Sequence, residues 1–170
     1  MSCHSHLMVL NYSDRNRDDV SRAHLAWGKL HRERVGPVER PSPTDANPER
    51  RLKIGYLSYV FQDHVDMMTV LGVLETHDRS VVQVFCYQQN TASDHVTARC
   101  KAAADTWVDV SSLSAQETAQ RIRQDEIDVL IDVGGHMGAA SALYVMLYRP
   151  APIQVRKCAA GEAETERECG

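Results

Sequence analysis

A doubly wound α/β fold, with helices flanking a parallel sheet, is the fold class that this sequence predicts. From residue 52 onward, short apolar runs alternate with stretches of helical character. Strict alternation of this kind is typical of parallel βαβ units rather than of a β-sandwich. The run at 129–133, Val-Leu-Ile-Asp-Val, is almost continuously apolar, and such runs are typical of strands that are buried on both faces.

The individual elements follow from this pattern. Strands are predicted at the apolar runs 52–58, 81–87, 107–110, 129–133 and 153–155. Helices are predicted between them, at about 66–76, 93–104, 114–125 and 139–147. The third of these helices begins with a capping box, Ser114-Ala-Gln-Glu117, in which each end residue bonds the other's backbone amide. The fourth must end before Arg149-Pro150, because a residue that precedes proline disfavours the helical conformation.

A helical segment is predicted to precede the sheet, over residues 1–35. Its N-cap is expected at Ser13 or Asp14, because Asp18 and Asp19 then fall in the first turns of a helix. Apolar residues recur at helical spacing and predict a buried stripe, with Trp27 as its core residue.

The remaining segments differ in composition from the sheet region, 52–155. Residues 36–51 contain four of the six prolines of the chain, which predicts a Pro-rich linker because proline cannot continue a helix. Residues 156–170 contain no large apolar side chain. A segment of this composition cannot anchor itself to a core, so we expect a disordered tail.

Charge and composition exclude several classes of protein. The chain has 170 residues and a formal charge of −4, so it lacks the basic field that non-specific nucleic-acid binding requires. It contains no apolar stretch long enough to span a membrane and no recognisable signal peptide. The five cysteines form no Cys-x-x-Cys pair, and this is typical of reduced thiols in a cytoplasmic protein.

Two predicted loops carry polar residues at the carboxyl ends of strands, where parallel α/β sheets bind ligands. The first runs from Ser58 to His64, and His64 has the side chain best suited to acid–base chemistry near neutral pH. The second contains Gly134 and Gly135, and neither glycine belongs to a nucleotide-binding fingerprint. Both loops have ordinary structural explanations as well: the glycines could only form a tight turn, and His64 could be a surface residue. Within the strand before the second loop, Asp132 would need a buried partner.

A metal site is not expected from the sequence. Cys3, His4 and His6 could chelate an ion, but no second cluster of ligands accompanies them. We therefore expect neither a structural zinc nor another metal.

Several motifs together resemble the catalytic region of the protein O-GlcNAc transferases, the SPINDLY-like enzymes of glycosyltransferase family 41. The resemblance covers roughly residues 4–155 in unbroken order. It rests on Arg51-Leu-Lys-Ile-Gly-Tyr-Leu-Ser58, Phe61-x-x-His64, Val84-Phe-Cys-Tyr87, Arg121-Ile-Arg-Gln-Asp-x-Ile-Asp-Val-Leu-Ile-Asp132, Gly135-His136 and Arg149-Pro-Ala-Pro-Ile-Gln-Val155.

The resemblance implies the Rossmann-like N-terminal lobe of a GT-B glycosyltransferase, in which two lobes face each other across a cleft. The family moves N-acetylglucosamine from UDP-GlcNAc to Ser/Thr hydroxyls of protein acceptors, without a metal or other cofactor. By this similarity His64 and His4 are the expected catalytic residues, and Asp63, Gly135 and His136 the expected substrate-binding residues.

The sequence also departs from the family pattern. Val60 stands where the family has an aspartate before the phenylalanine, and Val65 stands where proline follows the histidine. After Val155 the resemblance stops, and the donor-binding second lobe and the N-terminal helical repeats have no counterpart. We therefore expect an incomplete lobe with little activity alone. The alternative is a non-catalytic protein-binding module or an inert fragment of a disrupted gene, and the sequence does not decide whether this chain is itself an enzyme.

Overall fold

The computed structural model describes residues 7, 9–10, 13, 16–43, 45, 47–135 and 142–156. These residues form two compact units, one that contains helix α2 and a second that begins at Glu39 and contains the sheet. None of the helices in the described ranges has the length and apolar character needed to cross a membrane.

Helix α2, Arg17–Val35, begins at Asn16, whose side-chain oxygen accepts a hydrogen bond from the Asp18 amide at 3.0 Å. The predicted N-cap was therefore wrong. The Ser13 hydroxyl instead bonds back to a carbonyl three residues earlier, and Asp14 lies outside the described residues. Trp27 is buried, as predicted, and stacks on a histidine ring one turn later.

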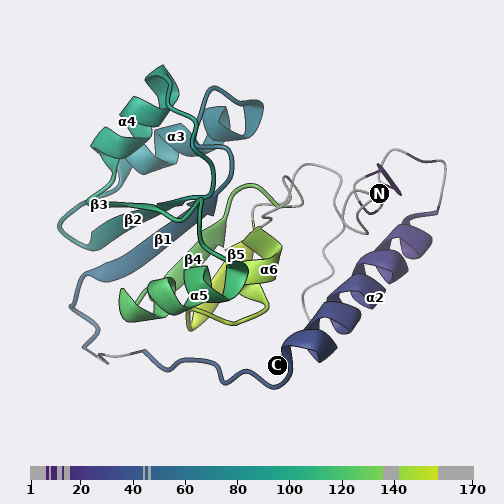
Figure 1. Ribbon diagram of the computed structural model, residues 1–170. Coiled ribbons are helices and arrows are strands. Elements are labelled where there is room, and N and C mark those ends of the chain that lie inside the picture. Colours follow the sequence, from purple (N-terminus) through teal and green to yellow (C-terminus); the bar gives the residue numbers. More distant parts are fainter. Residues whose placement is uncertain are drawn as a thin grey trace. The chain divides into compact units, whose positions relative to one another are not determined.

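The second unit contains a five-stranded sheet in which every pairing is parallel. The strand order is β3-β2-β1-β4-β5, with β1 at the centre (Figure 1). The strands are β1 Leu52–Ser58, β2 Val82–Gln88, β3 Thr106–Asp109, β4 Val129–Asp132 and β5 Ile153–Arg156. This arrangement confirms the predicted fold class, because the order reverses direction at β1 as in doubly wound α/β sheets.

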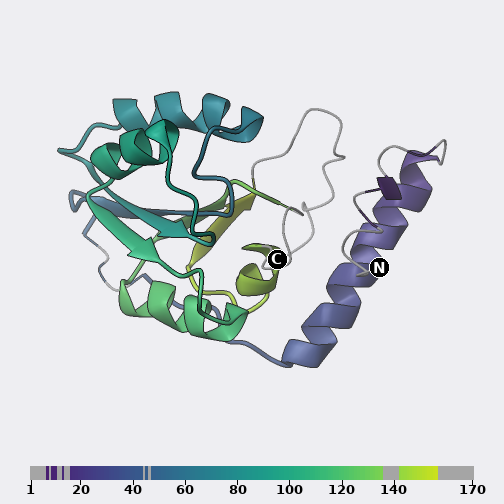
Figure 2. The same cartoon turned by 45° about the horizontal axis from the view of Figure 1, so that its top comes forward.

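Helices cover both faces of the sheet (Figure 2). Helices α3 and α4 lie on one face, and α5 and α6 lie on the other. Their bounds are α3 Val65–Thr76, α4 His95–Ala103, α5 Ala115–Gln124 and α6 Ala142–Met146. Neighbouring residues of a strand point to opposite faces, so Tyr56 belongs to the apolar cluster under α3 and α4, while Leu57 belongs to the cluster under α5 and α6.

Two of the helices that the structure describes begin with a capping box, and the sequence motif predicted one of these boxes. Ser114 and Glu117 bond each other's amides at the start of α5, as predicted. Asp94 and Thr97 do the same at the start of α4. The second box has threonine in place of the usual Glu or Gln.

The structure modifies one predicted boundary near the end of the chain. Arg156, predicted as the first tail residue, is the last residue of β5 and pairs with Asp132 of β4. Residues 157–170 lie outside the described residues, as does 136–141, which includes the predicted start of the fourth helix.

The Pro-rich segment is attached to the sheet unit by an ion pair. The Arg50 guanidinium contacts both carboxylate oxygens of Asp128, at 2.6 and 2.5 Å, and the Lys53 amide donates to the same carboxylate at 2.9 Å. Asp128 directly precedes β4 and is buried. Burial raises the pKa of the Asp128 carboxyl, but the hydrogen bonds from Arg50 and Lys53 outweigh it, so the pKa lies below its ordinary value.

Replacing Asp128 by Asn should lower the free energy of unfolding by roughly 1–3 kcal/mol, because Arg50 then loses its charged acceptor. Since the folded carboxyl has the lower pKa, this contribution is present above about pH 4 and is lost as the pH falls further. Urea unfolding of both proteins across pH 3–7 measures it.

Glu126→Gln is the matched control, because it breaks the neighbouring but more exposed pair with Lys53. That variant should change stability by less than about 1 kcal/mol. Equal effects of the two substitutions would show that the Arg50–Asp128 pair has no special role.

Candidate active site

The carboxyl ends of β1 and β4 meet at the centre of the sheet. The helix that follows β1, α3, and the helix that follows β4, α6, cover opposite faces of the sheet (Figure 2). Parallel α/β sheets bind ligands at such a switch point. The two loops adjoin here, because the Val133 amide donates to the Leu57 carbonyl at 3.1 Å. A Cβ placed on Gly134 would also lie only 3.7 Å from the Tyr59 nitrogen.

His64 is the N-cap of helix α3. Its Nδ1 accepts a hydrogen bond from the Asp66 amide at 3.2 Å, and Oδ2 of Asp66 lies 3.4 Å from the same nitrogen. A neutral imidazole that accepts at Nδ1 carries its hydrogen on Nε2. The side chain remains 30% exposed, so in this state His64 offers a ligand a hydrogen-bond donor rather than a base.

Asn90 holds the start of the loop that leads to His64. Its side-chain amide donates to the Tyr59 carbonyl and, at 3.1 Å, to Oε1 of Gln62. Asn90 is itself oriented by Gln88, whose side-chain amide donates to Oδ1 of Asn90 at 2.8 Å. The turn after β2 therefore fixes the loop after β1.

Phe61 anchors the middle of the same loop in the core. The ring is fully buried and lies 5.0 Å from the Trp107 ring, centroid to centroid. The buried Thr97 hydroxyl donates to the Phe61 carbonyl at 2.6 Å. Val60 is also buried and belongs to the apolar cluster under α3 and α4. The position at which the resembling family has an aspartate thus contributes to core packing here.

Asp63 lies on the exposed side of the loop, next to His64. Its amide donates to Oδ2 of Asp94 at 2.7 Å. Its carboxylate forms no hydrogen bond or ion pair with the part of the chain that the structure describes. The carboxylate is therefore available to a ligand at this edge.

Asp132 shapes the loop after β4. The side chain is fully buried, and its Oδ1 accepts hydrogen bonds from the amides of Gly134 at 2.9 Å and Gly135 at 2.8 Å. The predicted need of Asp132 for a partner is thereby confirmed. Gly135 has φ = +54°, which favours glycine, and a Cβ there would lie 3.2 Å from the Arg156 guanidinium.

The structure brings three of the five predicted site residues to this edge: Asp63, His64 and Gly135. The other two, His4 and His136, lie outside the described residues. Sequence reasoning missed Asn90, Asp94 and Thr97, which hold the His64 loop. Only the Asp-x-x-Thr spacing of the last two, a variant capping box, could have indicated a role for them.

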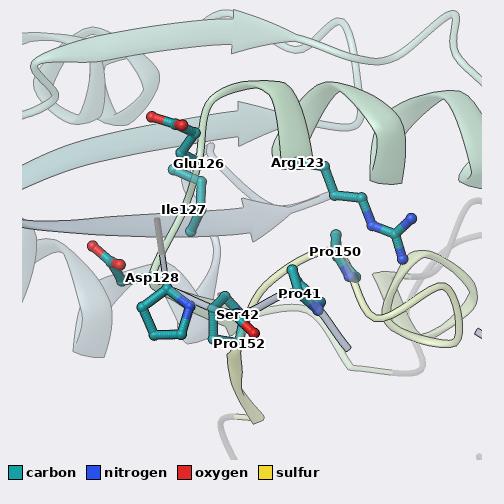
Figure 3. A pocket seen from close by; sticks show the side chains of 9 residues that line it. Pro41, Ser42, Arg123, Glu126, Ile127, Asp128, Pro150 and Pro152 are labelled. Atoms are coloured by element: carbon teal, nitrogen blue, oxygen red, sulfur yellow. The ribbon is translucent and has the colours of Figure 1, made fainter. Parts of the chain in front are cut away.

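The described residues contain no group of three His, Cys, Asp or Glu side chains arranged to hold a metal ion. A small hollow lies at the opposite, amino end of the strands (Figure 3). Pro41, Pro150 and Pro152 line it, beneath the turn that carries Glu126 and Ile127. Its polar lining is Ser42 and three charged side chains near the ends of α5 and β4, namely Arg123, Glu126 and Asp128. None of these residues belongs to the loops that carry His64 and Gly135, so the hollow is separate from that edge.

The five parallel strands with helices on both faces define a Rossmann-like lobe, and comparison with known proteins identifies its family. Residues 1–161 match the sequence pattern of the family described as "Glycosyl transferase family 41". The chain therefore belongs to glycosyl transferase family 41.

Relatives and solved structures agree with this assignment. A UDP-N-acetylglucosamine–peptide N-acetylglucosaminyltransferase of Caenorhabditis elegans is 32% identical over 89% of this chain and 14% of its own length. A probable enzyme of the same kind from Arabidopsis thaliana, SEC, is 34% identical over 81% of this chain and 14% of its own length. A mutant O-GlcNAc transferase of Thermobaculum terrenum superposes with a TM-score of 0.84 at 33% identity, over 95% of this chain and 30% of that one. This chain thus spans a small part of the proteins it matches.

Because His64 caps α3, its replacement by Ala should lower the free energy of unfolding by about 1 kcal/mol. His64→Asn should retain most of that stability, since asparagine is among the best N-cap residues. Thermal and urea unfolding of the two variants measure the difference. Equal destabilisation by Ala and Asn would contradict the capping role of the imidazole.

Proposed function

We propose that this chain supplies the first of two lobes of a transferase that moves N-acetylglucosamine from UDP-GlcNAc to Ser/Thr hydroxyls of protein acceptors. The observation that carries the proposal is the family match over residues 1–161, together with two polar loops that adjoin at the switch point of the sheet. Relatives named for transfer of N-acetylglucosamine to peptides are 32–34% identical to this chain. In this proposal a second lobe supplies the other contacts to the donor diphosphate, beside one hydrogen bond from His64.

The proposed reaction exchanges one bond at C1 of the sugar and transfers one proton. The acceptor hydroxyl oxygen attacks C1 of the sugar, the bond from C1 to the diphosphate oxygen breaks, and the hydroxyl proton passes to a base. Negative charge then builds on the departing UDP and must be stabilised by hydrogen-bond donors or cations. We assign His64 the role of such a donor through Nε2, because its Nδ1 lone pair is already used by the Asp66 amide.

The other predicted residues take complementary roles in this proposal. The exposed carboxylate of Asp63 can accept a hydrogen bond from a substrate hydroxyl. His4, Gly135 and His136 are assigned to the same cleft by family resemblance alone. No metal or other cofactor enters the proposed reaction.

A second candidate function is a non-catalytic module that binds proteins. Val60 favours it, because a buried apolar side chain stands where the family pattern has a carboxylate. Both candidates take proteins as partners, and they differ in whether sugar is transferred.

We place the protein in the cytoplasm as part of the same proposal. The two described cysteines, Cys86 and Cys100, are free and fully buried. Free thiols are typical of reducing compartments.

The proposal predicts that residues 1–156 will support transfer when they replace the matching segment of the unmutated Thermobaculum enzyme. Transfer of labelled N-acetylglucosamine to a protein acceptor is the measurement. In this graft His64→Asn should lower kcat about 100-fold, because the Nε2 donor is lost while the helix cap is kept.

His95→Asn is the matched control, since His95 is exposed at the start of a neighbouring helix. That variant should transfer at the rate of the unsubstituted graft. A folded graft without transfer would favour the binding module, and full activity of the His64→Asn graft would remove His64 from the mechanism.

A further inference from the structure

We infer that Asp94, the N-cap of α4, is a positioning residue for His64, because its carboxylate ties the loop before His64 to the start of α4. The significance of this contact for catalysis rests on the function proposed above. The contact itself, and its test, do not.

One carboxylate oxygen of Asp94 has a local task. Oδ1 accepts a hydrogen bond from the Thr97 amide at 2.8 Å, and Thr97 Oγ1 accepts one from the Asp94 amide at 3.2 Å. This capping box starts helix α4. A helix cap of this kind needs only one side-chain oxygen, which serine would also supply.

The second oxygen of Asp94 reaches another part of the chain. Oδ2 accepts a hydrogen bond from the Asp63 amide at 2.7 Å, across 31 residues of sequence. This amide lies in the residue immediately before His64. Hydrogen bonds from the Asp63 amide and then from the Thr97 amide hold the pKa of the Asp94 carboxyl below its usual range, so the group is ionised at neutral pH. Hydrogen bonds to ionised acceptors are stronger than those between neutral groups.

His64 is consequently held from both sides. Before it, the Asp63 amide is bound to Asp94. After it, the His64 carbonyl accepts from the amides of Met67 at 3.0 Å and Met68 at 3.2 Å. The direction of the imidazole thus depends on two helix starts, that of α3, which His64 caps, and that of α4, which Asp94 caps.

The Thr97 hydroxyl strengthens this arrangement. It donates to the Phe61 carbonyl at 2.6 Å, within the same loop and in a buried environment. The capping box of α4 therefore holds the loop at two points, the carbonyl of Phe61 and the amide of Asp63. If Asp94 and Thr97 served only to cap α4, neither would need to contact the loop that follows β1.

Asp94→Ser in the full chain separates the two tasks of the carboxylate, because serine keeps the cap oxygen and removes the second acceptor. NMR should then show solvent exchange of the Asp63 amide that is about 10- to 100-fold faster. The ring nitrogen resonances of His64 should move toward a mixture of tautomers. The cap of α4 should remain in place, since serine is an equally good N-cap.

Ser114→Ala is the matched control, because it removes the cap of α5. Within the described part of the chain, Ser114 bonds Glu117 and makes no hydrogen bond with the His64 loop. It should leave the Asp63 amide and the His64 ring unchanged. The inference is overturned if Asp94→Ser leaves both signals as they are, or if Ser114→Ala alters them equally.

These NMR signals do not require sugar transfer, so they separate this inference from the proposed function. In the active graft, Asp94→Ser should lower kcat about tenfold through misorientation of His64. A graft that lacks transfer while the NMR signals change as expected would contradict the proposed function and support the positioning role.

Discussion

The parallel pairing of β1 with β2 on one side and β4 on the other is the constraint on which the candidate site depends. Because all five strands run in the same direction, every loop that leaves a carboxyl end emerges at one edge of the sheet. The register places Ser58 beside Gln88 and Leu57 beside Asp132. The turns after β1, β2 and β4 are therefore neighbours, and side chains distant in sequence can bond one another there.

The two ends of the sheet use carboxylates differently. At the amino end, Asp128 joins a strand amide to an arginine, and Asp105 does the same with the Val84 amide and Arg79. At the carboxyl end, Asp94 and Asp132 bond backbone amides of loops instead. Ion pairs stabilise the amino end, whereas amide-bound carboxylates shape the end that carries His64.

His64 links stability to the proposed chemistry. One ring nitrogen completes the first turn of α3, and this leaves the other as a hydrogen-bond donor. A change of tautomer that made Nε2 a base would break the helix cap. The same hydrogen bond that stabilises α3 therefore restricts the chemical role of the ring.

Local sequence patterns determined much of this protein. Apolar runs located the five strands of the described sheet to within one residue, and the Ser114–Glu117 spacing predicted a helix start. Motifs spread from Arg51 to Val155 indicated the family. Only the tertiary structure decided what holds the His64 loop, since Asp94 and Asp63 are 31 residues apart and their contact depends on strand order and register. It also decided that Arg156 belongs to β5, where it pairs with Asp132 of β4. The physical reason is that periodicity and capping act over a few residues, whereas these contacts arise only when the sheet aligns distant turns.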